Sequence, residues 1–211
     1  MKLNFEEFTA QWSKLHGGAP TSGVVGGWLR ISFPLARGCA KLHITPNVLT
    51  TIGVLSAGLT AITSPHWWAL IFLALSLIAD GIDGSVAIYT ERTSATGAVW
   101  DGIADRISEA LWAIAFYRLG VPLSWILALA CFAGFQEYAR ARLASLGVAD
   151  VGVITPGERP VRASFLAVAI VAFHISFSHN WPTAIAIVLT FVQIISFLLV
   201  LRFAINSLKK P

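Results

Sequence analysis

The sequence predicts an all-α integral membrane protein, in which six transmembrane helices follow an N-terminal amphipathic helix that lies in the membrane interface. Two observations lead to this fold class. Only 12% of the 211 residues are charged and 56% are hydrophobic, whereas a soluble domain carries about 25% charged residues. Apolar runs of about 20 residues, long enough to cross a bilayer, recur along the chain. The net charge of +4 comes from basic residues spread along the chain, so we expect no nucleic-acid partner.

The first 43 residues are expected to lie outside the membrane core. Residues 1–20 are mixed and polar, without the apolar segment of a cleaved signal peptide, and Gly17 and Gly18 disfavour a helix there. Residues 24–43 alternate apolar and basic side chains, which predicts a helix in the interface with its cations near anionic headgroups. These cations are Arg30, Arg37 and Lys41. An ordinary surface helix is the alternative.

Residues 44–211 are expected to form one membrane domain of six spanning helices. We place these helices at residues 47–64, 67–89, 97–118, 122–147, 162–178 and 182–204. Because their number is even, both termini lie on one side of the membrane. Nearly all Lys and Arg fall on that side, and positively charged loops face the cytoplasm. The sequence therefore predicts a multi-pass protein of the cell membrane whose termini, 88–96 turn and 147–161 loop are cytoplasmic.

Four aspartates flank the 88–96 turn. Asp80 and Asp83 are three residues apart and Asp101 and Asp105 are four apart, so each pair lies on one face of its helix. Asp83 and Asp101 are each nine residues from Arg92, and Asp80 and Asp105 are twelve and thirteen residues from it, so a helical hairpin brings the carboxylates to matched depths on the cytoplasmic side. Charged groups inside a membrane are costly and mark functional sites. Four converging negative charges need cations, and hard divalent ions take oxygen ligands.

Ion pairing and ion conduction account less well for these aspartates than a metal site does. Arg92 and Arg106 offer only two cations to four anions. A channel or transporter also places carboxylates in a membrane. Here, however, the four aspartates lie on one hairpin, and the other expected spans have few polar residues that could line an ion path with them. Glycines are dense on the hairpin: Gly81, Gly84, Gly97 and Gly102. Since glycine lowers helix stability, their density indicates close approach by a ligand or a neighbouring helix.

The spacing of these residues carries a resemblance to a known family. The hairpin contains Asp80, Asp83, Gly84 and Ala87, then Gly97, Asp101 and Asp105. It resembles the signature of the CDP-alcohol phosphotransferases, D-x-x-D-G-x-x-A-R, eight residues, and G-x-x-x-D-x-x-x-D. The pattern extends with fixed spacing over the 26 residues from Asp80 to Asp105, which is far more specific than a lone glycine motif. The departure is Ile88, where the family has arginine.

The resemblance implies an enzyme that transfers the phosphatidyl group of CDP-diacylglycerol to an acceptor hydroxyl and releases CMP, in phospholipid biosynthesis. It also implies two Mg²⁺ or Mn²⁺ ions, contact with membrane lipid and a homodimer. The implied metal ligands are Asp80, Asp83, Asp101 and Asp105, and Asp105 is also the candidate catalytic base. The implied nucleotide site is Asn47, Gly84, Ala87, Arg92 and Gly97. Divalent ions would neutralise the diphosphate and the departing CMP, and a free carboxylate beside them can accept the acceptor's proton.

The isoleucine at position 88 allows three interpretations. Arg92, one helical turn later, can substitute for the missing cation, or the nucleotide is held differently, or the chain is a catalytically inactive scaffold. All four aspartates of the signature are present, which favours an active enzyme.

A basic cluster is expected around the cytoplasmic loop between the fourth and fifth spans. Its members are Arg140, Arg142, Arg159 and Arg162. The stretches Y-A-R-A-R and E-R-P-V-R that contain them are similar to those of bacterial phosphatidylinositol-phosphate synthases. Because arginine binds phosphate in a bidentate manner, this similarity implies a small phosphorylated polyol as acceptor, with inositol 1-phosphate first and glycerol 3-phosphate second. Positive-inside topology with headgroup contact is the alternative.

Overall fold

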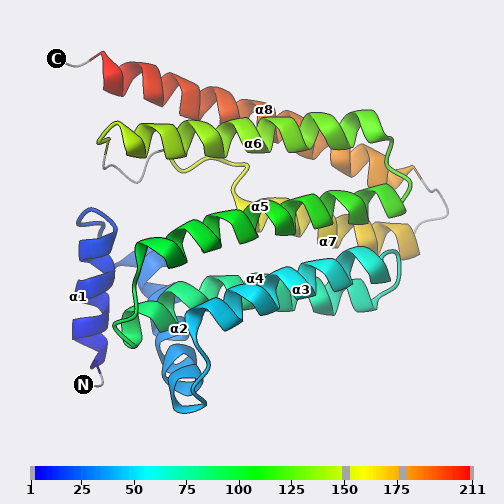
Figure 1. Ribbon diagram of the computed structural model, residues 1–211. Coiled ribbons are helices and arrows are strands. Elements are labelled where there is room, and N and C mark those ends of the chain that lie inside the picture. The colour runs from blue at the N-terminus through cyan, green and yellow to red at the C-terminus, as the bar shows by residue number, and fades with distance from the viewer. Residues whose placement is uncertain (1–2, 149–152, 176–179, 210–211) are drawn as a thin grey trace. The chain divides into compact units, whose positions relative to one another are not determined.

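The computed structural model describes residues 3–148, 153–175 and 180–209, which form eight helices and no strand (Figure 1). The helices are α1 (Phe5–Leu15), α2 (Gly23–Lys41), α3 (Pro46–Thr63), α4 (Trp68–Tyr89), α5 (Ala95–Arg118), α6 (Leu123–Ser145), α7 (Arg159–Ile175) and α8 (Trp181–Leu208). The prediction of an all-helical protein is therefore confirmed.

Helices α3 to α8 begin and end within a few residues of the six expected spans. Among the described residues, α3, α4 and α8 are long and apolar enough to cross a membrane. Length and composition alone do not identify α5, α6 or α7 as spans. Helices α5 and α6 carry several charged side chains, and the described part of α7 has 17 residues. Residues 149–152 of the expected 147–161 loop, and the end of the expected fifth span, lie outside the described residues.

Helix α1 is not among the expected helices. It begins at a capping box, in which the Asn4 side chain accepts from the Glu7 N–H and the Glu7 side chain accepts from the Asn4 N–H, at 2.9 and 2.8 Å. The helix stops just before Gly17 and Gly18, both of which have positive φ. The glycines therefore end a helix rather than prevent one, and the spacing N-x-x-E was the sequence signal for its start.

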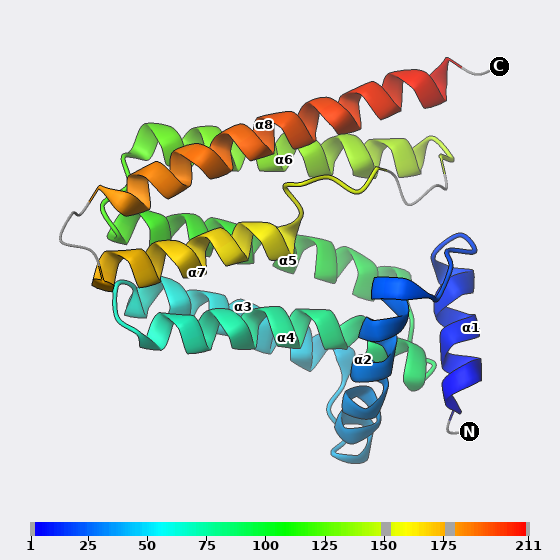
Figure 2. The same ribbon diagram turned by 180° about the vertical axis from the view of Figure 1, so that it is seen from behind.

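The chain divides into two compact units, which we describe separately. The first unit comprises residues 1–56 and 75–107, and the second comprises residues 57–74 and 108–211. In the first unit, α1, α2, the start of α3 and the second half of α4 bury a common apolar cluster. The members are Phe8, Leu29, Ala36, Leu49, Ile82, Val86, Ile88 and Tyr89. Helix α2 is the helix expected at 24–43, and in both ribbon views α1 lies beside the turn that joins α4 and α5 (Figures 1 and 2).

In the second unit, α8 packs along α6 and also contacts α7 (Figures 1 and 2). Two buried glutamines join α8 to α6, because the Gln193 amide donates to the Gln136 carbonyl oxygen at 2.6 Å. The turn after α3 is fixed by Arg118, whose Nε donates to the Ser64 carbonyl at 2.7 Å. The buried glutamine pair gives α6 and α8 a defined register.

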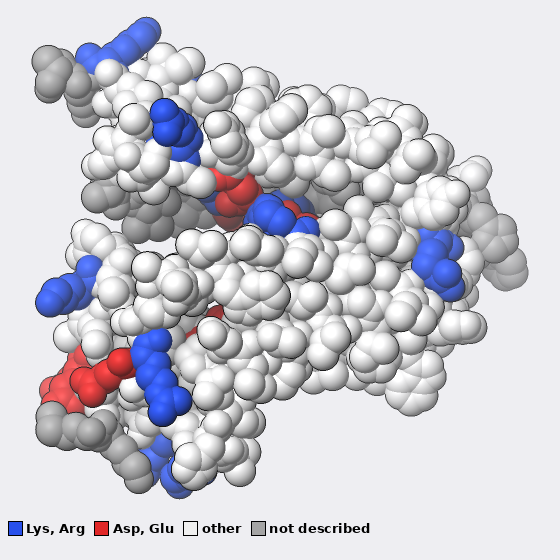
Figure 3. Space-filling view, in the orientation of Figure 1, with Lys and Arg blue, Asp and Glu red and all other residues white. Residues whose placement is uncertain are grey.

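Large apolar side chains cover the outer faces of several helices. Ile62, Leu55, Val188 and Leu198 are each more than half exposed. The face drawn in Figure 3 is mostly free of Lys, Arg, Asp and Glu over both units. Such a surface is unfavourable in water and is the surface expected of helices that contact lipid.

Candidate active site

Three aspartates of the α4–α5 hairpin meet in the first unit. Asp80 on α4 and Asp101 and Asp105 on α5 each offer a carboxylate oxygen, and these oxygens lie within 4.8 Å of one another. Ligands of one divalent ion with bonds of 2.0–2.6 Å lie about 3–5 Å apart. The all-oxygen donor set is also the type that Mg²⁺ and Mn²⁺ prefer. The residues therefore fit a hard divalent cation.

Asp83 is held differently from these three aspartates. Its side chain is 6% exposed, and one carboxylate oxygen accepts from the Thr50 hydroxyl on α3 at 2.5 Å. The other accepts from the Gly84 N–H at 2.6 Å. Both oxygens are thus engaged by protein donors, and Asp83 is not part of the three-carboxylate group. The sequence pattern did not indicate Thr50, which is 33 residues upstream and belongs to no motif.

A pocket of about 210 Å³ adjoins the aspartates within the first unit. Its lining includes every residue expected at the nucleotide site, namely Asn47, Gly84, Ala87, Arg92 and Gly97. Asp83 and Asp101 also line it, so the pocket shares Asp101 with the three-carboxylate group. The structure therefore brings the expected nucleotide residues together beside the expected metal ligands.

Two glycines of the hairpin have different surroundings. A Cβ added at Gly81 would lie 2.8 Å from the indole ring of Trp28 on α2, so Gly81 permits close helix packing. A Cβ added at Gly84 would meet no atom within 4 Å, and Gly84 lines the pocket. Close approach by a neighbouring helix therefore explains Gly81, whereas Gly84 leaves open space in the pocket.

Ile88 lies in the wall between the pocket and the apolar cluster. It is 4% exposed, belongs to the cluster and lines the pocket. Helix α4 ends at Tyr89, so Arg92 is in the following turn rather than one helical turn further along the same helix. Its N–H donates to the Ala87 carbonyl at 2.8 Å. Arg92 nevertheless lines the same pocket and offers a cation near the position where the family signature has one.

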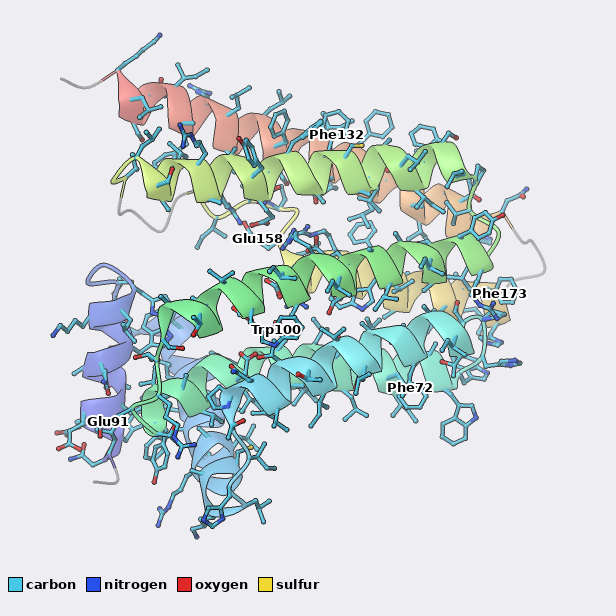
Figure 4. All side chains as sticks on the ribbon, in the orientation of Figure 1. Phe72, Glu91, Trp100, Phe132, Glu158 and Phe173 are labelled. Carbon is cyan, nitrogen blue, oxygen red and sulfur yellow. The ribbon has the colours of Figure 1, made fainter. Side chains whose placement is uncertain are left out.

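In the second unit, Arg140 anchors the segment that precedes α7. Its guanidinium donates to both oxygens of Glu158, at 2.9 and 2.5 Å, and to the Val153 carbonyl at 3.0 Å. Glu158, labelled in Figure 4, also accepts from the N–H and hydroxyl of Thr155. Burial alone would raise the pKa of Glu158, but the hydrogen bonds from Arg140 and Thr155 lower it to about 2. Glu158 is therefore ionised at neutral pH.

Arg159 and Arg162 have separate surroundings in the same unit. Arg162 is 5% exposed and pairs with Glu109 at 2.8 Å and Glu137 at 3.1 Å. The Arg159 guanidinium lies 5.2 Å from the centre of the Trp112 ring, a distance typical of a cation–π contact. The sequence pattern did not indicate Glu109 or Trp112 as partners of these arginines.

Arg142 does not lie with the rest of the basic cluster. It lines an apolar groove between α6 and α8, together with Tyr138 and Leu208. Residues two apart along a helix do not share a face, so Arg140 and Arg142 meet different surroundings. The structure therefore separates one member of the expected cluster from the three that have Glu or Trp partners within the unit.

Comparison with known proteins identifies the family of this hairpin. The family model described as CDP-alcohol phosphatidyltransferase matches residues 43–203. The chain belongs to the CDP-alcohol phosphatidyltransferase family. It is therefore a transferase of substituted phosphate groups, and members of this family are membrane proteins, in agreement with its apolar helices.

Several family members are similar over most of their length. An archaetidylinositol phosphate synthase of Aeropyrum pernix is 32% identical over 75% of this chain and 80% of its own length. A phosphatidylinositol phosphate synthase of Cutibacterium acnes is 32% identical over 71% of this chain and 75% of its own. Two crystal structures of the Mycobacterium tuberculosis phosphatidylinositol phosphate synthase share the fold. The structure with CDP-DAG bound has a TM-score of 0.65, 24% identity and coverage of 83% of this chain and 94% of that one. The structure in complex with manganese and citrate has a TM-score of 0.66, 23% identity and coverage of 83% and 89%.

Proposed function

We propose that the protein transfers the phosphatidyl group of CDP-diacylglycerol to a hydroxyl of a phosphorylated polyol, with inositol 1-phosphate as the favoured acceptor, and releases CMP. The observation that supports this proposal most directly is that Asp101 belongs to the three-carboxylate group and also lines the pocket. A diphosphate can then lie at the carboxylate group while its nucleoside occupies the pocket. The relatives named as inositol phosphate synthases support the choice of acceptor.

The residues of the hairpin would perform distinct tasks in this reaction. Asp80, Asp101 and Asp105 would hold two Mg²⁺ or Mn²⁺ ions, with Asp83 as a further ligand once its side chain turns from Thr50. Bound divalent ions neutralise the diphosphate and the departing CMP oxygen. The acceptor oxygen attacks the phosphorus that bears diacylglycerol, and the bond from that phosphorus to the CMP oxygen breaks. Asp105, as the base, accepts the hydroxyl proton.

The nucleotide and acceptor would be recognised by different residues. Asn47, Gly84, Ala87, Arg92 and Gly97 would surround the cytidine nucleotide, with Arg92 replacing the cation absent at position 88. The acceptor phosphate would be bound by the basic cluster of Arg140, Arg142, Arg159 and Arg162. Within it, Arg140 and Arg162 pair with glutamates, and the Arg159 guanidinium lies over the Trp112 ring.

The membrane placement is part of the same proposal. Helices α3 to α8 would form a membrane domain of residues 44–211 that crosses the cell membrane six times. Residues 1–43 would lie at its cytoplasmic side, with α2 in the interface. The active site and both termini would then face the cytoplasm, and the protein would act as a homodimer in contact with membrane lipid.

An acceptor panel tests this proposal. Purified protein is incubated with CDP-diacylglycerol and Mg²⁺, and CMP release is followed with inositol 1-phosphate, glycerol 3-phosphate and unphosphorylated inositol. We expect release with inositol 1-phosphate and much less with unphosphorylated inositol. If CMP were released faster with glycerol 3-phosphate than with inositol 1-phosphate, glycerol 3-phosphate would be assigned as the acceptor instead. No release with any acceptor from a folded, metal-binding protein would favour the inactive scaffold.

Arginine variants test the acceptor site within the same assay. Arg159→Ala should raise the KM for the acceptor much more than the KM for CDP-diacylglycerol, because a phosphate contact is lost only on the acceptor. Arg118→Ala, which removes an arginine held at the Ser64 carbonyl, is a control for loss of one positive charge. Equal effects of Arg159→Ala on both KM values would contradict a dedicated acceptor-phosphate site.

A further inference from the structure

A series of hydrogen-bonded side chains ties the segment before α7 to α6 and α8. The Gln193 amide on α8 donates to the Gln136 carbonyl oxygen on α6 at 2.6 Å, and the Gln136 amide donates to the Thr155 hydroxyl oxygen at 3.3 Å. The Thr155 hydroxyl then donates to a carboxylate oxygen of Glu158 at 2.8 Å. We call these four side chains the glutamine network. Each member donates to the next, and the last acceptor is an ionised carboxylate.

The glutamines of this network are costly to bury. Gln136 and Gln193 are each 0% exposed, and Thr155 is 4% exposed. An amide buried among apolar helices is unfavourable unless it is hydrogen-bonded. Replacing both partners of a hydrogen bond with apolar groups of the same shape is often nearly neutral, so contact between α6 and α8 alone does not require the glutamines. What they add is the bond from Gln136 to Thr155, outside both helices.

The segment before α7 also lies directly against α8. Gly157 is buried, and a Cβ added there would lie 2.6 Å from the Ser196 Oγ and 2.9 Å from the Gln193 Oε1. Gln193 and Ser196 are three residues apart and share one face of α8. No side chain larger than hydrogen therefore fits between the segment and this face. Gln193 thus contacts the segment directly as well as through Gln136.

The same segment determines where α7 begins. Helix α7 starts at Arg159, immediately after Glu158. The Glu158 carbonyl accepts from the N–H groups of Val161 and Arg162, at 2.9 and 3.1 Å. Glu158 is therefore joined by its side chain to the glutamine network and by its backbone to the first turn of α7. Two arginines of the basic cluster, Arg159 and Arg162, belong to this turn.

We propose that the glutamine network positions the first turn of α7 for binding of the acceptor phosphate. This inference rests on the proposed function, in which Arg159 and Arg162 belong to the acceptor site. Arginine binds phosphate through a fixed fork of donors, and a displacement of about 1 Å is enough to lose such geometry. Gln136 and Gln193 act through Thr155 and Glu158, so they are positioning residues. The expected nucleotide residues belong to the first unit, so nucleotide binding should not depend on the network.

The test compares the binding of inositol 1-phosphate and of CMP to the full chain in detergent with Mg²⁺, by titration calorimetry. Gln136→Leu removes the donor to Thr155. Thr155→Val removes the hydroxyl with little change of shape, and Thr155→Ser retains it. Thr190→Val is the matched control, because Thr190 is buried on α8 and its hydroxyl donates to the Ala186 carbonyl of its own helix at 2.8 Å. Titrations are run well below the lowest Tm of the set, and the Thr155 variants decide the test if Gln136→Leu does not fold.

We expect Gln136→Leu and Thr155→Val each to weaken binding of inositol 1-phosphate roughly three- to tenfold, the size of one hydrogen bond. Binding of CMP should stay unchanged. The combined variant should bind inositol 1-phosphate about as weakly as either single variant, because both changes break the same network. Thr155→Ser and Thr190→Val should bind both ligands like the parent.

Several outcomes would overturn the inference. They are equal weakening for inositol 1-phosphate and CMP, unchanged binding of inositol 1-phosphate, additive losses in the combined variant, and a Thr155→Ser variant that binds as weakly as Thr155→Val. If binding of inositol 1-phosphate depends on the network but no acceptor gives CMP release, the inference stands and the proposed transfer reaction fails. If the parent binds CMP but no inositol 1-phosphate, the inference and the proposed acceptor fail together.

Discussion

The hydrogen bond from Thr50 to Asp83 provides the sharpest test of the site geometry. Replacing Thr50 with valine keeps the shape of the side chain and removes the hydroxyl that donates to the carboxylate at 2.5 Å. Both residues are buried, at 5% and 6% exposure, so water cannot replace the lost donor. Removing one partner of a buried hydrogen bond, so that the other is left unsatisfied, costs about 1–3 kcal/mol. We therefore expect Thr50→Val to lower the free energy of unfolding by about 2 kcal/mol.

Thermal unfolding of the purified chain in detergent, without added metal, measures this effect. For a chain of this length, about 2 kcal/mol corresponds to a Tm lower by roughly 4–8 °C. Thr51→Val is a matched control, because Thr51 is exposed and its hydroxyl donates to the Asn47 carbonyl of its own helix at 2.8 Å. We expect the control to change the free energy of unfolding by less than about 0.5 kcal/mol.

A double-mutant cycle isolates the pair. In an Asp83→Leu background, Thr50→Val should lower the Tm by clearly less than in the parent, because the side-chain acceptor is gone. Equal losses for Thr50→Val and Thr51→Val, or an unchanged loss in the Asp83→Leu background, would refute the claim that Thr50 holds Asp83 in place.

Three further predictions concern Glu158 and the two contrasting glycines. The pKa of Glu158 is lowered to about 2, below its ordinary value of about 4.3. The ionised carboxylate therefore stabilises the fold at pH values above about 4.3, and this stabilisation is lost as the pH falls toward 2. Glu158→Gln should therefore lower the Tm at pH 7, and the difference from the parent should shrink between about pH 5 and pH 2; a constant difference would contradict the ion pair with Arg140. Gly81→Ala should give a lower Tm than Gly84→Ala, because both changes share the same gain in helix propensity but only the methyl group at Gly81 meets a neighbour, the ring of Trp28; equal Tm values for the two variants would contradict the close contact of Gly81 with Trp28. Gly84→Ala should have a Tm no lower than that of the parent, because alanine favours the helix and its methyl group meets no atom, but it should bind CMP more weakly in a calorimetric titration, since the methyl group enters the pocket; unchanged affinity would place the nucleotide elsewhere.

Helices α3 to α8 could be predicted from the sequence because they coincide with long apolar runs, and this signal is local. The aspartates of the hairpin could also be predicted, since spacings of three and four fix a face on any helix. Asp80, Asp101 and Asp105 do meet. The separate environment of Asp83 depends on Thr50 from another helix, and no periodicity within α4 encodes that contact.

Further features of the site depended on tertiary packing in the same way. Arg140 and Arg142 are both positive charges at the end of an expected span, yet one is committed to Glu158 and the other lines an apolar groove. In the sequence, Ile88 stands where the family signature has a cationic arginine. In the structure, its side chain is part of the apolar cluster on which α1 packs. Helix α1 itself had a local signal in the capping box of Asn4 and Glu7, but its packing on that cluster followed only from the fold.

The central claim is that the carboxylates of the α4–α5 hairpin carry a metal-dependent release of CMP. The most direct measurement is the rate of CMP release from CDP-diacylglycerol and inositol 1-phosphate, with Mg²⁺ or with chelator, for the parent, Asp105→Asn and the control Glu91→Gln, whose carboxylate is exposed in the turn after α4. We predict release by the parent and by Glu91→Gln with Mg²⁺ only, and a loss of at least about 100-fold in Asp105→Asn, within the range of general-base catalysis. Release that persists in chelator, or an Asp105→Asn variant as fast as the parent, would contradict the claim.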